Sequence, residues 1–217
     1  MNKFFSIDSP LMVALGRIMD LVILSFLWLI CSIPVITAGS ATAALYYVTL
    51  KLVRGDEVKV AGAFFHSFKT NLKQGIVLTL IFLILGGVLF ADYFIMSGVM
   101  TTFGTISSII FLAMGTVVLN TMFYTFPLQA QFVNTIRGTL KNAFFLSVQK
   151  ISNMFIIFIM NMLPLIALLL SIDIFIRLLP LWLFFAPAGI AYVCSIRFVK
   201  IFEPMMKPAE PQKDTED

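Results

Sequence analysis

Charged residues are scarce in this 217-residue chain: Asp, Glu, Lys and Arg make up only 12% of it, whereas 60% is hydrophobic. A soluble domain carries roughly a quarter charged residues. The polar side chains are too few to cover a water-soluble globule, and the mean hydropathy of +1.00 indicates that lipid surrounds most of the chain. This excludes a cytosolic enzyme, a secreted disulfide scaffold and a disordered regulator.

Cysteine and histidine are equally rare. Cys31 and Cys194 both lie in apolar runs, where cysteines pack as small hydrophobic side chains, so we predict no disulfide. His66 is the only histidine, and without a Cys/His spacing we predict neither a metal site nor a cofactor. Gly-x-Ser-x-Gly and His-Glu-x-x-His motifs are absent from the sequence, so we expect a protein that is not an enzyme.

The net charge of +4 does not indicate nucleic-acid binding. Fifteen Lys and Arg residues face eleven Asp and Glu residues, but no run of five to eight residues is rich in Lys and Arg with interleaved aromatics. The basic residues lie in the gaps between apolar runs, where the positive-inside bias of membrane proteins places them.

Five apolar runs approach the roughly 20 residues that a helix needs to cross a bilayer. They are Gly16–Ile36, Gly75–Ile95, Thr105–Phe126, Met154–Ile172 and Leu178–Phe202. We therefore predict an all-α polytopic bundle with about five transmembrane helices. The first run is too long for the apolar part of a signal peptide and contains Arg17 and Asp20, so we interpret it as a retained span.

The basic residues also predict the orientation of the spans. The four gaps and the C-terminal end contain five, none, three, one and four Lys or Arg residues in chain order. This alternation places the three richer segments and the C-terminus in the cytoplasm and, with five spans, the N-terminus outside. In the alternative with six spans, Pro34–Leu50 crosses the membrane as an extra helix and the N-terminus lies inside.

A short motif occurs twice, 80 positions apart. Ala61–Lys73 has apolar residues at helical spacing and a basic opposite face, which is typical of an interfacial amphipathic helix. Its Ala-Phe-Phe-His-Ser segment returns as Ala-Phe-Phe-Leu-Ser at 143–147. We predict two parallel repeat units, 16–95 and 105–172, and a closing span at 178–202.

Together, residues 1–202 are expected to form a single membrane domain, and the proline-containing tail 203–217 is expected to be disordered and cytoplasmic.

Several ionisable residues lie inside or beside the apolar runs, where a buried charge usually has a function. Most are within two turns of a run's end, where they can reach water or headgroups. Arg17, Asp20 and Asp92 are the main candidates, and Asp92 has apolar or aromatic neighbours on both sides. The simpler interpretation for all of them is interfacial anchoring.

The segment that follows the first run is the least regular part of the sequence. Pro34 is expected to end or kink the first helix, because proline lacks an N–H and its ring clashes with the preceding turn. Thr37 and Gly39 follow it, and Gly39–Thr42 is interpreted as a turn before a helix at Ala43–Arg54. Such a break either lines a cavity or simply ends a helix.

The segments Phe4–Pro10, Asp20–Trp28, Ile33–Gly39 and Thr42–Tyr47 resemble the YesL-like family of bacterial integral membrane proteins. The resemblance covers about residues 4–202, and its most specific part is Pro-Val-x-Thr-x-Gly at Pro34–Gly39. Many members have proline after that glycine, where this chain has Ser40. The family has no established activity, and its association with carbohydrate ABC transporters implies an accessory role in sugar uptake.

Two functions are therefore expected from the sequence. The first is an accessory or scaffold subunit of the bacterial cytoplasmic membrane, with permease subunits of an ABC transporter or a sensor kinase as its partner. The second is a small solute carrier with a cavity near Pro34–Thr42 and Asp92. A scarcity of central polar residues along the runs favours the first.

Overall fold

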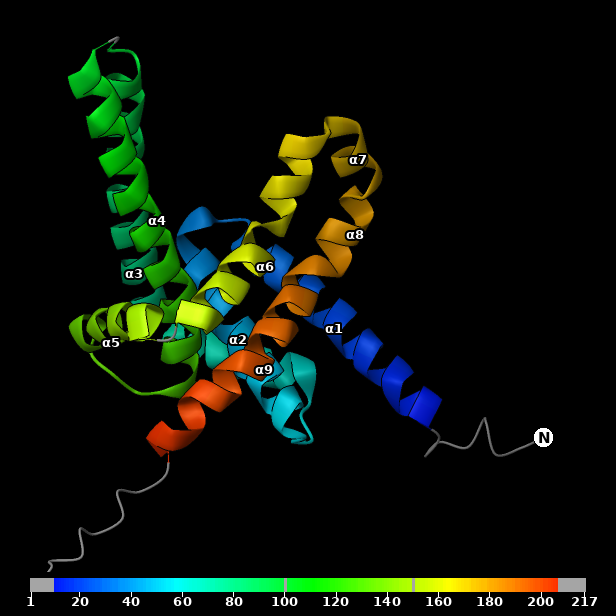
Figure 1. Ribbon diagram of the computed structural model, residues 1–217. Helices are drawn as coiled ribbons and strands as arrows, with labels where there is room; N and C mark the ends of the chain where they lie inside the picture. The colour runs from blue at the N-terminus through cyan, green and yellow to red at the C-terminus, as the bar shows by residue number, and fades with distance from the viewer. Residues whose placement is uncertain (1–9, 100, 150, 207–217) are drawn as a thin grey trace, which may run out of the picture.

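The computed structural model describes residues 10–99, 101–149 and 151–206. The regular elements within these ranges are helices, as the sequence predicts (Figure 1). In chain order they are α1 (Pro10–Ser32), the short 3-10 helix η1 (Val35–Thr37), α2 (Ala38–Arg54), α3 (Val60–Ser97), α4 (Thr102–Gln131), α5 (Ile136–Gln149), α6 (Ile151–Leu170), α7 (Ile172–Arg177), α8 (Leu179–Phe184) and α9 (Ala186–Met206).

Five helical segments in the described ranges are long and apolar enough to cross a membrane, judged by length and composition. They are Leu15–Ser32, Val35–Arg54, Val60–Ser97, Thr102–Gln131 and Asn153–Leu170. The all-α fold class with about five spanning helices is thus confirmed, but one member differs from the prediction. The extra helix of the six-span alternative is among the five, and the predicted run at 178–202 is not.

The run at 178–202 is two helices, because the chain leaves helical geometry at Phe185, between α8 and α9. Pro187 lies in the first turn of α9, where its missing N–H costs nothing. The next N–H, that of Ala188, donates to Ser25 Oγ of α1 at 3.1 Å. At its other end α9 continues through Pro204 to Met206, so the start of the predicted tail is helical. The rest of the tail, 207–217, lies outside the described residues.

α2 is the central helix and contacts α1, α3, α4 and α9. The residues that begin it are small and buried, which lets neighbouring helices approach closely: Gly39, Ser40, Ala41, Ala43 and Ala44. The helix ends at Gly55, whose φ of 85° is the left-handed conformation that glycine adopts without strain. Its N–H donates back to Leu52 O at 3.2 Å.

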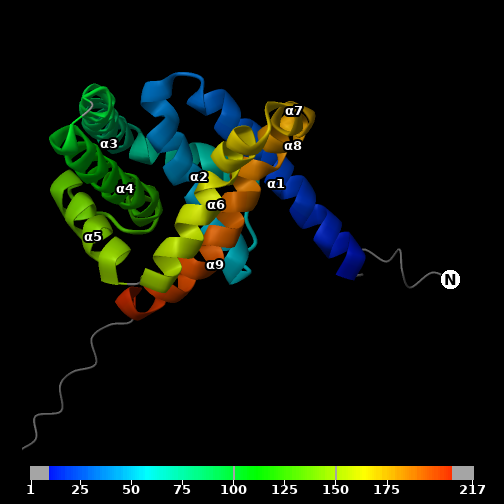
Figure 2. The ribbon, with the colours of Figure 1, turned by 45° about the horizontal axis from the view of Figure 1, so that its top comes forward.

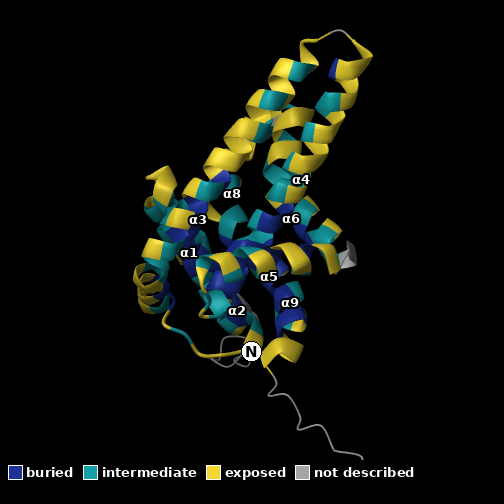
Figure 3. Ribbon diagram, turned by 90° about the vertical axis from the view of Figure 1, so that its left-hand side faces the viewer, coloured by how far each residue is buried: buried dark blue, intermediate teal, exposed yellow. Residues whose placement is uncertain are grey.

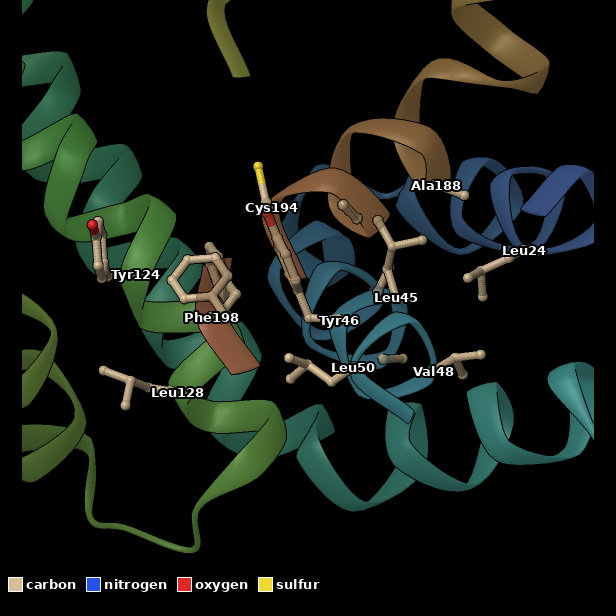
Figure 4. Packing of buried hydrophobic residues seen from close by; sticks show 14 of the residues in the cluster. Leu24, Leu45, Tyr46, Val48, Leu50, Tyr124, Leu128, Ala188, Cys194 and Phe198 are labelled. Carbon is tan, nitrogen blue, oxygen red and sulfur yellow. The ribbon is translucent and has the colours of Figure 1, made fainter. Parts of the chain in front are cut away.

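Aromatic rings and one buried polar contact hold α2, α4 and α9 together. The Phe198 ring of α9 packs edge to face against Tyr46 of α2 and Tyr124 of α4, with ring centroids 5.7 and 5.3 Å away (Figure 4). Thr49 and Ser195 share a buried hydrogen bond of 2.8 Å between α2 and α9. The core therefore lies where these three helices cross.

α3 and α4 form a long hairpin whose far half stands away from the other helices (Figures 1 and 3). α3 has 38 residues, or about 57 Å at ~1.5 Å per residue, whereas the hydrocarbon core of a bilayer is about 30 Å thick. The buried positions of α3 end at Phe82, and those of α4 resume at Asn120 after a single one at Gly104. The far half of the hairpin is therefore mostly exposed and apolar.

The predicted interfacial helix at Ala61–Lys73 is the first part of α3, and no break separates it from the span that follows. Its buried face also differs from the predicted apolar face. Phe64 and Ser67 are buried, whereas Ala61 is exposed and Phe65 is 43% exposed. Hydrophobic periodicity did not predict the burial of Ser67, whose hydroxyl accepts a hydrogen bond from Asn71 Nδ2 of the same helix at 3.2 Å.

The second copy of the motif lies in α5, a separate helix that runs across the near end of the hairpin and lies against α4 (Figures 1 and 2). Ala143 and Ser147 are buried there, while Phe144 is 45% exposed. The serines of the two copies are thus both buried, but the first phenylalanines differ. The internal repeat stays a prediction.

Candidate functional site

The predicted break after the first apolar run is a tight turn between α1 and α2. Pro34 is exposed with extended backbone angles, and Thr37 closes the turn. The Thr37 hydroxyl can donate a hydrogen bond to either of two carbonyl oxygens, Cys31 O at 2.7 Å or Pro34 O at 2.8 Å. The prediction that Gly39–Thr42 forms the turn is wrong, because α2 already begins at Ala38.

Gly39 instead lies where α2 packs closely against α3 and α4. Its N–H donates to Thr79 Oγ1 of α3 at 3.1 Å. A Cβ added at Gly39 would overlap Thr79 and the Phe126 ring, and one added at Gly75 would overlap Ser40 of α2. Glycine is required at both positions for steric reasons, so this junction is a packing site.

Two further polar side chains satisfy backbone carbonyls of α3 across the same junction. Ser40 Oγ of α2 donates to Leu72 O at 3.1 Å, and Gln129 Nε2 of α4 donates to Asn71 O at 3.2 Å. These bonds fix the rotation of α3 against its neighbours. Sequence reasoning named Ser40 only as a departure from the family pattern and predicted neither bond, because isolated polar residues in apolar runs have no periodic signal.

Arg17 joins three helices at one end of the bundle. Its Nη1 donates to Leu52 O in the last turn of α2 at 3.1 Å and to the Tyr192 hydroxyl of α9 at 3.3 Å. A cation at the C-terminal end of a helix complements the partial negative charge of its carbonyls. Asp20, half-buried one turn further along α1, interacts electrostatically with Arg17.

Asp92 lies on the far half of the α3–α4 hairpin and is half-exposed. Thr79, which contacts Gly39, is 13 residues earlier on α3, so about 20 Å of helix separates the two positions. The structure therefore does not bring Asp92 and the Pro34–Thr42 segment to one cavity, and that part of the carrier hypothesis is wrong.

A partly open cavity of about 330 Å³, which we call the central cavity, lies between helices from both halves of the chain. Its walls come from α1, α2, α4 and α6–α9, and six of its fifteen lining residues are aromatic: Trp28, Tyr46, Phe123, Phe126, Phe175 and Trp182. None of the fifteen is charged. Both tryptophans of the chain line this one cavity, although 154 positions separate them.

The polar groups in the cavity wall are bonded to the protein or covered by it. Trp28 Nε1 donates to Thr42 Oγ1 at 3.1 Å, and Asn161 Nδ2 donates to Ile157 O at 2.8 Å. Trp182 Nε1 is buried without a partner among the described residues. Of the predicted segment Pro34–Thr42, only Thr42 lines the cavity. Sequence reasoning missed the cavity because its walls come from distant helices.

A second hollow, a groove of about 350 Å³, runs between the exposed parts of α3 and α4. Its walls are apolar and aromatic, and they include Gly86 of α3 and Gly115 of α4. A Cβ added at either glycine would meet nothing within 4 Å. The groove is therefore open along the side of the hairpin.

These surfaces suit the binding of apolar groups and of other helices. Within the described ranges, no three His, Cys, Asp or Glu side chains gather as metal ligands do. His66 is exposed on α3, and Cys31 and Cys194 are free thiols.

Comparison with known families gives a match over the first part of the chain. Residues 21–93 match the family described as "Protein of unknown function, DUF624". The DUF624 match covers about a third of the chain, from α1 to near the end of α3, and includes the Pro34–Gly39 turn. It supports similarity to an uncharacterised family, and the narrower resemblance to YesL-like proteins stays a prediction. No curated protein and no solved structure matches the chain significantly.

Proposed function

We propose that this protein is a non-enzymatic accessory subunit of the bacterial cytoplasmic membrane that binds a permease subunit of a carbohydrate ABC transporter. The α3–α4 groove is the proposed contact surface, and a transmembrane helix of the permease is its occupant. The carbohydrate transporter comes from the YesL-like resemblance, and the open glycines of the groove support the contact.

Gly86 and Gly115 are the observation that supports a partner helix most strongly. Glycine in a helix interior costs about 1 kcal/mol relative to alanine, and a helix that faces only lipid gains nothing in return. Membrane helices use small residues where another helix approaches closely. No described helix of this chain covers either glycine, since an added Cβ would contact nothing.

A small solute carrier, the alternative function, has less support. Carriers hold polar solutes between polar side chains or exposed backbone ends, usually at broken helices. The central cavity is apolar and aromatic, and Asp92 is not among the residues of its wall.

The proposal is tested by purifying tagged protein from its native host in mild detergent and identifying the co-purified proteins by mass spectrometry. We expect ABC permease subunits in stoichiometric amounts with the wild type and a loss of at least about tenfold with Gly86→Leu or Gly115→Leu. An interfacial glycine replaced by a bulky side chain prevents the close approach of a helix.

Gly87→Leu is the matched control, because Gly87 also has open space around it but does not line the groove. It is expected to retain the permease. Recovery of a sensor kinase in place of a permease, recovery of the protein alone at several detergent strengths, or equal recovery with all three variants would contradict the proposal. If the protein is recovered alone, its ability to take up solutes in proteoliposomes is measured next, which tests the carrier alternative.

A further inference from the structure

We propose that the central cavity binds one acyl chain of a membrane lipid or fatty acid. This site is independent of the proposed accessory function, because the cavity and the α3–α4 groove are different surfaces, which share only Met122 in their walls.

The volume of the cavity is appropriate for a hydrocarbon ligand. An apolar cavity of roughly 150 Å³ holds one benzene molecule, and this cavity has about 330 Å³. Known small-molecule sites begin at about 300 Å³ and are mostly apolar with a few polar groups. The cavity can therefore hold a segment of an acyl chain between its aromatic walls.

Water is a poor occupant of this cavity. A buried water needs two to four polar partners. Thr42 Oγ1, which accepts from Trp28 Nε1, also donates to Ala38 O at 2.8 Å. The Tyr46 hydroxyl interacts with Asn161 and Cys194. Trp182 Nε1 has no partner among the described residues, but the other polar groups named here are bonded within the protein, so the wall offers few contacts to water.

An empty cavity would also be unfavourable, because the wall atoms would lose their dispersion contacts on one side. Lipid is the apolar molecule at hand. α1 and α6, which both contribute to the wall, expose large apolar side chains elsewhere on their surfaces: Ile23, Phe26, Ile30, Ile159, Leu165 and Ile166. The wall is uncharged, it shares two helices with this apolar surface, and it complements a neutral chain.

The chain's own fluorescence provides the test. Trp28 and Trp182 are its only tryptophans, and both line the cavity. Dibromostearic acid, whose bromine atoms quench nearby indoles, is added to the full-length protein in detergent micelles. We expect saturable quenching at one acid per chain, reversed by unbrominated oleic acid. Trp28→Phe and Trp182→Phe, each with a single tryptophan left, should both be quenched.

A cavity-filling variant locates the site. Ala186 lines the cavity at the start of α9, and Gly189 lies three residues further along but does not line it. Ala186→Phe is expected to weaken the apparent affinity about tenfold, since its ring displaces two or more methylenes of about 0.8 kcal/mol each. Gly189→Phe, where an added Cβ meets nothing within 4 Å, is the control and should bind as the wild type does.

Quenching of the wild type that does not saturate and that oleic acid does not reverse would show simple partition of the acid into micelles, and it would overturn the proposal. This outcome does not depend on whether a variant folds. Equal affinity of folded Ala186→Phe and wild type would overturn it as well. Native mass spectrometry of the purified protein identifies the source of the chain, because a phospholipid and a free fatty acid add different masses. Failure of this test leaves the permease co-purification unaffected, and the reverse also holds.

Discussion

At the scale of single residues, Gly75 and Gly87 lie on the same helix in opposite surroundings. A Cβ added at Gly75 would overlap Ser40, including backbone atoms of α2 that cannot move aside. The same atom added at Gly87 would meet nothing within 4 Å. Close packing of α2 against α3 therefore depends on one of these glycines and not on the other.

The variants Gly75→Ala and Gly87→Ala should consequently differ in their effect on stability. Overpacking at Gly75 is expected to destabilise the fold by about 1–3 kcal/mol. At Gly87, the better helix propensity of alanine should leave stability unchanged or raise it by up to about 1 kcal/mol. Thermal unfolding of both variants in the same detergent measures the difference. Shifts of the same sign and size would show that α2 and α3 do not pack as described.

At the scale of helices, two breaks fall inside predicted apolar runs: the end of α1 near Pro34 and the break between α8 and α9 at Phe185. The sequence predicts the first break but not the second. The end of α1 is predictable as a kink or an end, because Pro34 lacks an N–H donor and its ring clashes with the preceding turn, although α9 continues through Pro204. The break at Phe185 is not, because the apolar run continues through it and the N–H of Ala188 finds its acceptor in Ser25, 163 positions away. Likewise, local pattern predicted the helices, whereas the cavity between Trp28 and Trp182 depends on tertiary contacts.

Removal of the Ser25 hydroxyl tests this long-range cap. Ser25→Ala leaves the buried N–H of Ala188 without its acceptor, which is expected to cost about 1–3 kcal/mol. Thermal unfolding reports the loss, and hydrogen exchange should accelerate in the first turn of α9. Ser108→Ala is the control, because its hydroxyl bonds only Gly104 O of its own helix. A similar small effect of both variants would refute the role of Ser25.

At the scale of the whole molecule, contacts of two arginines show that several helix ends lie at the same end of the bundle. Arg17, near the start of α1, bonds Leu52 O near the end of α2, so these two helices run antiparallel. Arg54, at the end of α2, bonds Gln131 at the end of α4 at 2.9 Å and contacts Met206 at the end of α9. The start of α1 thus lies at the same end as the ends of α2, α4 and α9.

This geometry, combined with the positive-inside bias, predicts an N-terminus in the cytoplasm, as in the alternative in which Pro34–Leu50 crosses the membrane. Thiol labelling of intact cells tests it after Cys31 and Cys194 are replaced by alanine. Asp56→Cys, between α2 and α3, and Asn2→Cys should react with an impermeant maleimide only after permeabilisation. Val99→Cys, in the exposed connection between α3 and α4, should react from outside.

External labelling of Asn2→Cys together with protection of Asp56→Cys would instead place α1 and α2 on a path that crosses the bilayer only once. The contact between Arg17 and Leu52 O would then have to be absent in the membrane, because the start of α1 and the end of α2 would lie on opposite sides of the bilayer.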